Sequence, residues 1–254
     1  MNEILFFKPI VKECVWGREY WLISAHENGD TEVLNGDCKG RRLSWLFANK
    51  RELFGNLDYD RFPLLVKIID AQDDLSVQVH PDDEYAHRNE NGALGKTECW
   101  NILECDDKAT IVIGHNAATI DEAKEMIANN RWSDFLREIP IKRNDFFQIT
   151  PGTVHAIKSN TKLIEIQQNS DITYRMYDYN RVYNGKQREL HLSKSLDVIN
   201  IPFDEEASHV SCEDDSVITC DFYCVDKYEI DGVKEFDMDK SFHIISVIAG
   251  SYGR

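Results

Sequence analysis

Polar and ionisable side chains recur at every second position in two short segments whose residue types can bind a divalent metal ion. In the segment that ends at His80, alternation places Ser76, Gln78 and His80 on one face of a predicted strand. Lys96 and Glu98 form a second pair of this kind, directly before an apolar run. Because imidazole and carboxylate groups together are typical zinc ligands, the two segments predict a metal site.

A second histidine, His155, follows a Pro151-Gly152 turn at the start of another predicted strand. A single histidine on a strand is more often a structural residue than a ligand, but three such patterns in one chain favour a metal site. The sequence therefore predicts four ligands delivered by three strands of a barrel, namely Gln78, His80, Glu98 and His155. His115 is also a possible ligand, although its place beside a turn favours a structural role.

A third alternating segment, at residues 163–168, carries a candidate acid or base. Glu165 and Gln167 share one face of this predicted strand. A carboxylate inside a barrel would be desolvated, and its pKa could rise to suit general acid–base catalysis. The alternative is a structural ion pair with Lys158 or Lys162.

Four segments, QVHPDD, GKTECW, PGTVHAI and LIEIQQNSDITYRMYDYNR, resemble the signature segments of type I mannose-6-phosphate isomerase (phosphomannose isomerase) in its short bacterial form. The resemblance extends over nearly the whole chain, with the segments in the same order. It implies a zinc-dependent aldose–ketose isomerase built on cupin-type barrels, with one Zn²⁺ per chain. It also implies that Arg175, by its position in the motif, is a catalytic arginine.

The reaction that this resemblance implies interconverts mannose 6-phosphate and fructose 6-phosphate through an enediol intermediate. Glu165 is the candidate base, with His155 or a zinc-bound water as alternatives, and Arg175 would stabilise the oxyanion or orient the substrate. The candidate substrate-binding residues are Lys67, Ser76, Lys96, Asp171 and Arg181. Lys67 lies within an apolar run, where an ammonium group needs a partner.

Two other functions remain open at this stage. One is a non-catalytic, metal-containing cupin that binds or senses a sugar phosphate, against which the presence of both Glu165 and Arg175 argues. The other is a different metal-dependent cupin isomerase or oxygenase. Iron oxygenases use a facial triad with open positions, which Gln78 as a fourth ligand fits less well.

The elements that must position these residues are mainly strands, so the predicted fold is a cupin-like jelly-roll barrel with helical additions. A helix is expected over residues 41–54, ending at Gly55. A longer one is expected over 119–138, capped by Thr119 or Asp121 and with a break near Asn129-Asn130. A short helix and a loop are expected over 82–95, and a helix-like link over 188–199.

The chain is expected to divide into a catalytic domain, residues 1–200, and a partial second cupin sheet, residues 201–254. The second part contains too few predicted strands for a barrel. It is therefore expected to be C-terminally short, or to have an open edge covered by a neighbour. If a second copy of the chain covers this edge, the protein is a homo-oligomer.

Composition limits the partners and the compartment. The 254 residues carry a net charge of −16, which argues against a nucleic-acid-binding surface and requires local cations to hold a sugar phosphate. No apolar run is long enough to span a bilayer, so no membrane partner is expected. The seven cysteines, without CxxC spacing, indicate free thiols in a reducing cytoplasm.

Overall fold

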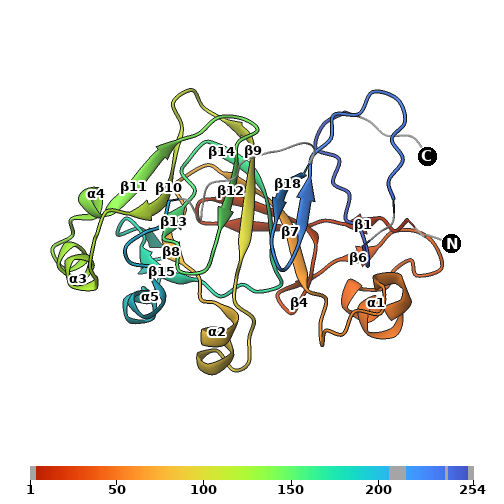
Figure 1. The fold of residues 1–254 in the computed structure, drawn as a ribbon, viewed down its shortest axis with the longest axis horizontal. Helices are drawn as coiled ribbons and strands as arrows, with labels where there is room; N and C mark the ends of the chain where they lie inside the picture. The colour runs from red at the N-terminus through yellow and green to blue at the C-terminus, as the bar shows by residue number, and fades with distance from the viewer. Residues whose placement is uncertain (1–3, 206–215, 238–239, 251–254) are drawn as a thin grey trace.

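Two antiparallel sheets that face one another form the body of the molecule in a computed structural model, which describes residues 4–205, 216–237 and 240–250 (Figure 1). The strands of the first sheet are β8 (Val77–Val79), β10 (Thr110–His115), β11 (Leu136–Pro140), β13 (His155–Ala156) and β15 (Tyr174–Tyr177). Those of the second are β2 (Ile10–Cys14), β3 (Gly17–Ile23), β7 (Leu64–Ala71), β9 (Glu98–Cys105), β12 (Phe146–Ile149) and β14 (Thr161–Gln168). The orders are β11-β10-β13-β8-β15 and β12-β9-β14-β7-β3-β2.

Four shorter strand pairs and the helices complete the described elements. The pairs are β1 (Phe7–Lys8) with β6 (Glu32–Val33), β4 (Ala25–His26) with β5 (Gly29–Asp30), β16 (Val182–Tyr183) with β17 (Lys186–Gln187), and β18 (Ser216–Thr219) with β19 (Cys224–Asp226). The helices are α1 (Leu43–Asn49), η1 (Arg51–Phe54), α2 (Asp83–Asn89), α3 (Ile120–Ala128), α4 (Trp132–Phe135) and α5 (Leu192–Val198).

Apolar side chains pack in three layers around the two sheets. Between the sheets, Trp100 and Leu163 of the second sheet pack with Ile113 of the first. The outer face of the first sheet is covered by α3, α4 and α5, and that of the second by α1, η1 and the C-terminal segment (Figure 1). Because the inner faces of the two sheets pack against one another, the polar side chains that point between them are enclosed by protein.

The predicted helix at residues 41–54 is confirmed, as is its end. It consists of α1 followed by the 3₁₀ turn η1, and Gly55 follows with a left-handed φ of 62°. A glycine adopts this conformation without the steric cost that a side chain brings, which is why it terminates the helix. Helix α2 is also present where it was expected, with the Asp82 carboxylate accepting a hydrogen bond from the Tyr85 N–H.

The predicted helix over residues 119–138 is right at its start and at its break near Asn129-Asn130, and wrong at its end. Thr119 caps α3, and the helix breaks near Asn130, whose φ is positive at 54°. After the single turn α4, residues from Leu136 onward form strand β11 instead. The physical reason is pairing with β10, which places Ile139 opposite Ile111. Such long-range pairing overrides local helix propensity.

The helix-like link over residues 188–199 is partly wrong, because only α5, from Leu192, is helical. Residues 188–191 are not helical and lie beside β15, as described below. In the C-terminal segment, β18 and β19 form a two-stranded sheet, with Val217 and Tyr223 packed in the same core as α1. Among the described residues after 226 no further strand is assigned. The division of the chain near residue 200 stays a prediction.

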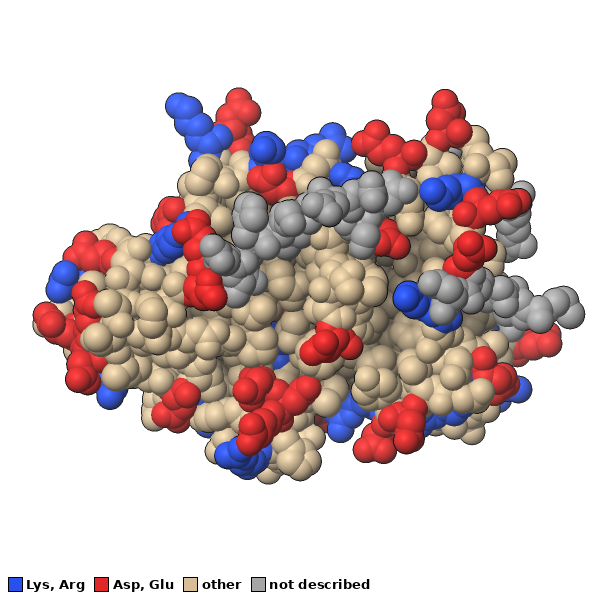
Figure 2. Space-filling view, viewed as in Figure 1, with Lys and Arg blue, Asp and Glu red and all other residues tan. Residues whose placement is uncertain are grey.

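The surface carries acidic and basic groups side by side, with acidic groups in excess. Figure 2 shows Asp and Glu side chains distributed over the whole visible face, with Lys and Arg interspersed among them. This distribution agrees with the net charge of −16. None of the described helices is both long and apolar enough to cross a bilayer.

Candidate metal centre

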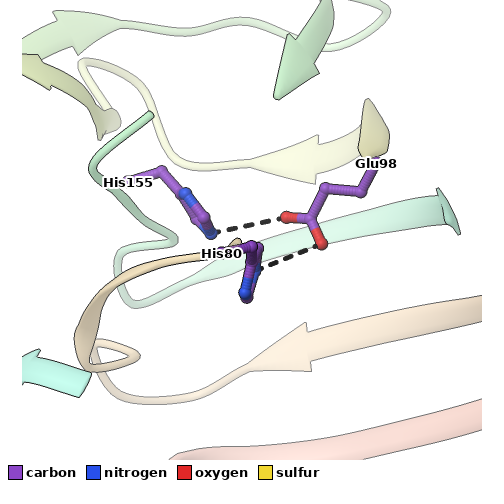
Figure 3. Close-up of side chains that lie close together, drawn as sticks. All are labelled: His80, Glu98 and His155. Carbon is purple, nitrogen blue, oxygen red and sulfur yellow. Dashed lines mark ion pairs between the residues drawn. The ribbon is translucent and has the colours of Figure 1, made fainter. Parts of the chain in front are cut away.

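His80, Glu98 and His155 meet between the two sheets, in the arrangement drawn in Figure 3. Glu98 begins β9 of the second sheet, whereas His155 begins β13 and His80 follows β8 of the first. The Nε2 atom of His155 lies 3.4 Å from Glu98 Oε1, and that of His80 lies 3.5 Å from Glu98 Oε2. All three side chains are buried. The structure thus brings together three of the four predicted ligands in one enclosed cluster.

The hydrogen bonds of the two histidines define which nitrogen is available to a metal. Nδ1 of His80 lies 2.8 Å from the carbonyl oxygen of Ile172, and Nδ1 of His155 lies 2.8 Å from that of Thr153. Because a carbonyl only accepts, each Nδ1 carries the proton and each Nε2 presents a lone pair toward Glu98. Such backbone contacts orient metal-ligating imidazoles in other proteins.

Burial keeps both imidazoles neutral, as metal binding requires. Desolvation lowers the pKa of His155 to about 4. It also lowers the pKa of His80 well below its usual value, and the nearby ammonium group of Lys96 acts in the same direction. At neutral pH both Nε2 lone pairs are therefore free of a proton.

Strand pairing places Gln78 on the same face as the cluster. Gln78 of β8 lies opposite His155 of β13 on one side and opposite Arg175 of β15 on the other. Residues that are directly opposite in an antiparallel pair project to the same side of the sheet. Its role as the fourth ligand stays a prediction.

The three residues fit a borderline divalent ion such as zinc. Glu98 Oε1 and His155 Nε2 are buried and have no hydrogen-bond partner among the described residues, and Glu98 Oε2 has only an ion pair. Lys96 Nζ lies 2.7 Å from Glu98 Oε2 as an ion pair and 3.1 Å from His80 Nε2. Two neutral imidazoles and a carboxylate are a common zinc ligand set. The donors thus suit a cation, and Lys96 borders the place where it would bind.

A second buried network, around Glu165, adjoins this cluster. Glu165 of β14 lies opposite Lys67 of β7 and Trp100 of β9. Lys67 Nζ lies 2.9 Å from Glu165 Oε1 and 3.4 Å from Glu19 Oε1, while Trp100 Nε1–H donates to Glu165 Oε2 at 2.9 Å. Lys96 Nζ, 3.7 Å from Glu165 Oε1, connects the network to the metal ligands. Lys67 thus has the partners that its place in an apolar run requires.

The electrostatics of this network are dominated by the Lys67 ammonium group. Burial disfavours its charge, but the carboxylates of Glu165 and Glu19 outweigh that effect and raise the pKa of Lys67. Neither Glu19 nor Trp100 was identified as a site residue from the sequence. For Trp100 the available signal was alternation, since it follows Glu98 by two positions and shares its face. Glu19, on β3, is far in sequence from the predicted residues and has no such signal.

Arg175 and Ser76, two further predicted site residues, lie together at the edge of the first sheet. The Arg175 Nε–H donates to Ser76 Oγ at 3.3 Å, and its Nη1–H donates to the carbonyl oxygen of Glu189 at 2.9 Å. The guanidinium is half-buried, and desolvation together with the neighbouring Arg188 lowers the pKa of Arg175. The structure therefore brings a cation and a hydroxyl to the face that carries Gln78.

The contacts of Asp171 and Arg181 are made outside the metal cluster. Asp171 is half-exposed, accepts a hydrogen bond from Asn28 Nδ2 at 2.5 Å and lies 3.5 Å from His26 Nε2. The guanidinium of Arg181 donates to the carbonyl oxygen of Asp74 and lies 3.6 Å from Asp178 Oδ1. The roles of Asp171 and Arg181 in substrate binding stay predictions.

His115 has the structural contacts that its position beside a turn indicated. Its Nε2 lies 2.9 Å from the carbonyl oxygen of Asn200, and its ring stacks on Phe135 with the ring centroids 5.2 Å apart. His115 is not part of the cluster formed by the three candidate ligands.

Comparison of the chain with known proteins identifies its relatives. The family model described as phosphomannose isomerase type I, catalytic domain, matches residues 6–108. The mannose-6-phosphate isomerase ManA of Bacillus subtilis is 47% identical over 272 residues, which cover 98% of this chain and 86% of that protein. A mannose-6-phosphate isomerase of Streptococcus mutans is 44% identical, with 98% of this chain and 86% of that protein covered.

Solved structures agree with the fold. The crystal structure of the mannose 6-phosphate isomerase from Bacillus subtilis superposes with a TM-score of 0.87 and 39% identity, covering 93% of this chain and 83% of that one. A putative mannosephosphate isomerase from Archaeoglobus fulgidus shares the fold at 21% identity, with a TM-score of 0.65 over 85% of this chain and 73% of that one. The predicted mainly β, cupin-type fold is confirmed.

Proposed function

This chain belongs to the type I mannose-6-phosphate isomerase family, and we propose that it interconverts mannose 6-phosphate and fructose 6-phosphate between its two sheets. The observation that carries the proposal is the buried cluster of His80, Glu98 and His155, whose potential ligand atoms converge. We further propose that these residues, with Gln78, hold one Zn²⁺ per chain. A zinc ion bound there would act as a Lewis acid toward the sugar oxygens.

The isomerisation moves a proton from C2 of the aldose to C1 of the ketose, through an enediol. We assign the proton transfer to Glu165, whose carboxylate is enclosed and oriented by Lys67 and Trp100. His155 is the weaker candidate for the base, since its Nδ1 is bonded to a carbonyl and its Nε2 faces Glu98. Because Lys67 is engaged by two carboxylates, we assign it to orienting Glu165 ahead of binding the phosphate.

Negative charge grows on the sugar oxygens as the proton leaves, and cationic donors that are already in place stabilise it. Arg175 is the proposed donor, since its guanidinium lies on the face that also carries Gln78. Lys96, next to Glu98, is a second cation at the same place. Ser76, which accepts a hydrogen bond from Arg175, is the proposed contact for the sugar or its phosphate.

The compartment and the assembly belong to the proposal as well. The six cysteines in the described part of the chain are free thiols, which supports a reducing cytoplasm, and Cys212 lies outside the described residues. The acidic net charge supports a small-molecule substrate over a nucleic acid. A homo-oligomer stays a prediction.

Metal analysis tests the proposed ligands. We expect His80→Ala and His155→Ala each to lose the single equivalent of zinc that the wild type retains after dialysis, because either change removes an Nε2 donor. Isomerisation of mannose 6-phosphate should be lost with it. His87→Ala, which removes an exposed histidine from α2, is the matched control and should keep both. A full equivalent of zinc in both ligand variants would contradict the assignment.

A further inference from the structure

Arg175 lies on β15, the last strand of the five-stranded sheet, and a short segment of the chain runs beside it. We call residues 188–191 the strap. They follow the exposed β16–β17 hairpin and lead directly into α5. A last strand presents backbone N–H and C=O groups that have no neighbouring strand on one side. The strap supplies hydrogen-bond partners to the main-chain groups of Arg175 on this side of β15.

His191 pairs with both backbone groups of Arg175, one through its main chain and one through its side chain. The His191 N–H donates to the carbonyl oxygen of Arg175 at 2.7 Å. In the other direction, the Arg175 N–H donates to Nδ1 of the His191 imidazole at 3.1 Å. The side chain thus replaces the backbone carbonyl that would accept this bond in a regular sheet.

The strap also contacts the guanidinium group and is itself anchored at both ends. The carbonyl oxygen of Glu189 accepts a hydrogen bond from Arg175 Nη1 at 2.9 Å. At the start of the strap, Arg188 donates two hydrogen bonds to the Asp178 carboxylate, at 2.8 and 2.5 Å. At its end, the Ser195 N–H of α5 donates to the carbonyl oxygen of His191 at 2.9 Å.

We propose that His191 is a positioning residue, whose imidazole fixes the main chain of Arg175 so that the guanidinium meets the substrate in the correct place. This inference rests on the role of Arg175 in the proposed function. The pairing of β15 with β8 is irregular directly after Arg175, so the main chain there is held less firmly by its sheet neighbour than in a regular ladder. On the side of β15 away from β8, the two hydrogen bonds with His191 hold the main chain of Arg175 in place.

Replacement of His191 by residues that differ in acceptor position gives a sharp test. Asn places its Oδ1 where the histidine has Nδ1, whereas Gln places its oxygen near the position of Nε2 and Ala offers no acceptor. We expect His191→Ala and His191→Gln to lower kcat about tenfold or more, with a smaller change in KM, because displacing a catalytic group slows the chemical step. His191→Asn should restore most of kcat. Equal activity of the Asn and Gln variants would overturn the proposal.

A double-mutant cycle separates this inference from the function on which it rests. If His191 acts through Arg175, then His191→Ala should lower kcat in the wild type but have almost no effect in an Arg175→Ala background. An equal effect in both backgrounds would overturn the inference and leave the role of Arg175 intact. If Arg175→Ala alone leaves kcat unchanged, the proposed role of Arg175 fails instead.

Amide hydrogen exchange provides a readout that does not depend on turnover. The Arg175 amide should exchange faster in His191→Ala than in the wild type and regain protection in His191→Asn, since only the latter restores an acceptor. Zinc content should be the same in all three proteins. His87→Asn on α2 is the control for loss of a histidine, with unchanged exchange at Arg175. Unchanged protection in His191→Ala would contradict the positioning role.

Discussion

At the scale of single residues, the proposed metal site depends on neutral imidazoles and on which ring nitrogen of each carries no proton. His80 and His155 each give Nδ1–H to a backbone carbonyl, so their Nε2 atoms converge on Glu98. His115 shows the alternative fate of a buried histidine in the same protein. Its Nε2 is bonded to the carbonyl oxygen of Asn200, and its ring packs against Phe135. The rings of His80 and His155 face the carboxylate of Glu98, whereas no ion pair with a carboxylate is found for His115 among the described residues.

His115 makes the stability of the protein depend on pH. Burial lowers the pKa of His115, so the unfolded chain takes up a proton at a higher pH than the folded chain does. The contribution of His115 to stability is therefore complete above about pH 6.5 and decreases as the pH falls below this value. His115→Gln keeps an N–H donor near the position of Nε2 but does not titrate. We expect its melting temperature to fall less than that of the wild type between pH 7 and pH 5, measured by circular dichroism.

The comparison between the two proteins cancels the titration of the other histidines, which both share. Parallel decreases of the melting temperature over this pH range would contradict the account of His115.

At the scale of elements, strand pairing decides which side chains meet. Lys67, Glu165 and Trp100 lie in one row across β7, β14 and β9, and Gln78, His155 and Arg175 lie in a row across the facing sheet. Since the side chains of a strand alternate between its two faces, a register shift of one residue would remove a whole row from the site. The rows are therefore the structural basis of the site.

The row that contains Lys67 predicts a strong effect on stability. Lys67→Met would remove the nearest cation from the buried carboxylate of Glu165 and from the partly buried carboxylate of Glu19, and we expect it to lower the free energy of unfolding by about 3 kcal/mol. Adding Glu165→Gln should recover part of this loss, because it removes one of the two carboxylate charges that Lys67 neutralised. Urea unfolding of the two variants and the wild type measures both effects. A double variant that is no more stable than Lys67→Met would contradict the ion-pair account.

Much of this arrangement could be predicted from local sequence, because alternation determines which face a side chain takes. The faces of Gln78, His80 and Glu165 are those that the alternation indicated. What could not be predicted depends on contacts distant in sequence. Local sequence assigns residues 136–138 to a helix, but they pair with β10 as part of a strand. The partner of Lys67 proved to be Glu165, from a strand about a hundred positions away.

At the scale of the whole molecule, the candidate site is formed by residues from both sheets. The first sheet and its connections provide the imidazoles and Arg175, and the second provides Glu98, Lys96 at its border, and Glu165. Figure 3 shows the two imidazoles converging on Glu98. Helices cover the outer face of the first sheet, and α1 with the C-terminal segment covers that of the second. The proposed reaction site therefore lies between two layers of protein, which limits its contact with water.

The most direct test of this account follows isomerisation in heavy water by nuclear magnetic resonance. Zinc-loaded wild type and Glu165→Gln, with zinc content verified as equal, are each mixed with mannose 6-phosphate in D₂O. We predict that the wild type forms fructose 6-phosphate and introduces deuterium at carbon-bound positions of C1 or C2, whereas Glu165→Gln is slower by about a hundredfold or more. A zinc-loaded wild type that binds mannose 6-phosphate but forms no fructose 6-phosphate would contradict the central claim and indicate a sugar-phosphate-binding protein without turnover.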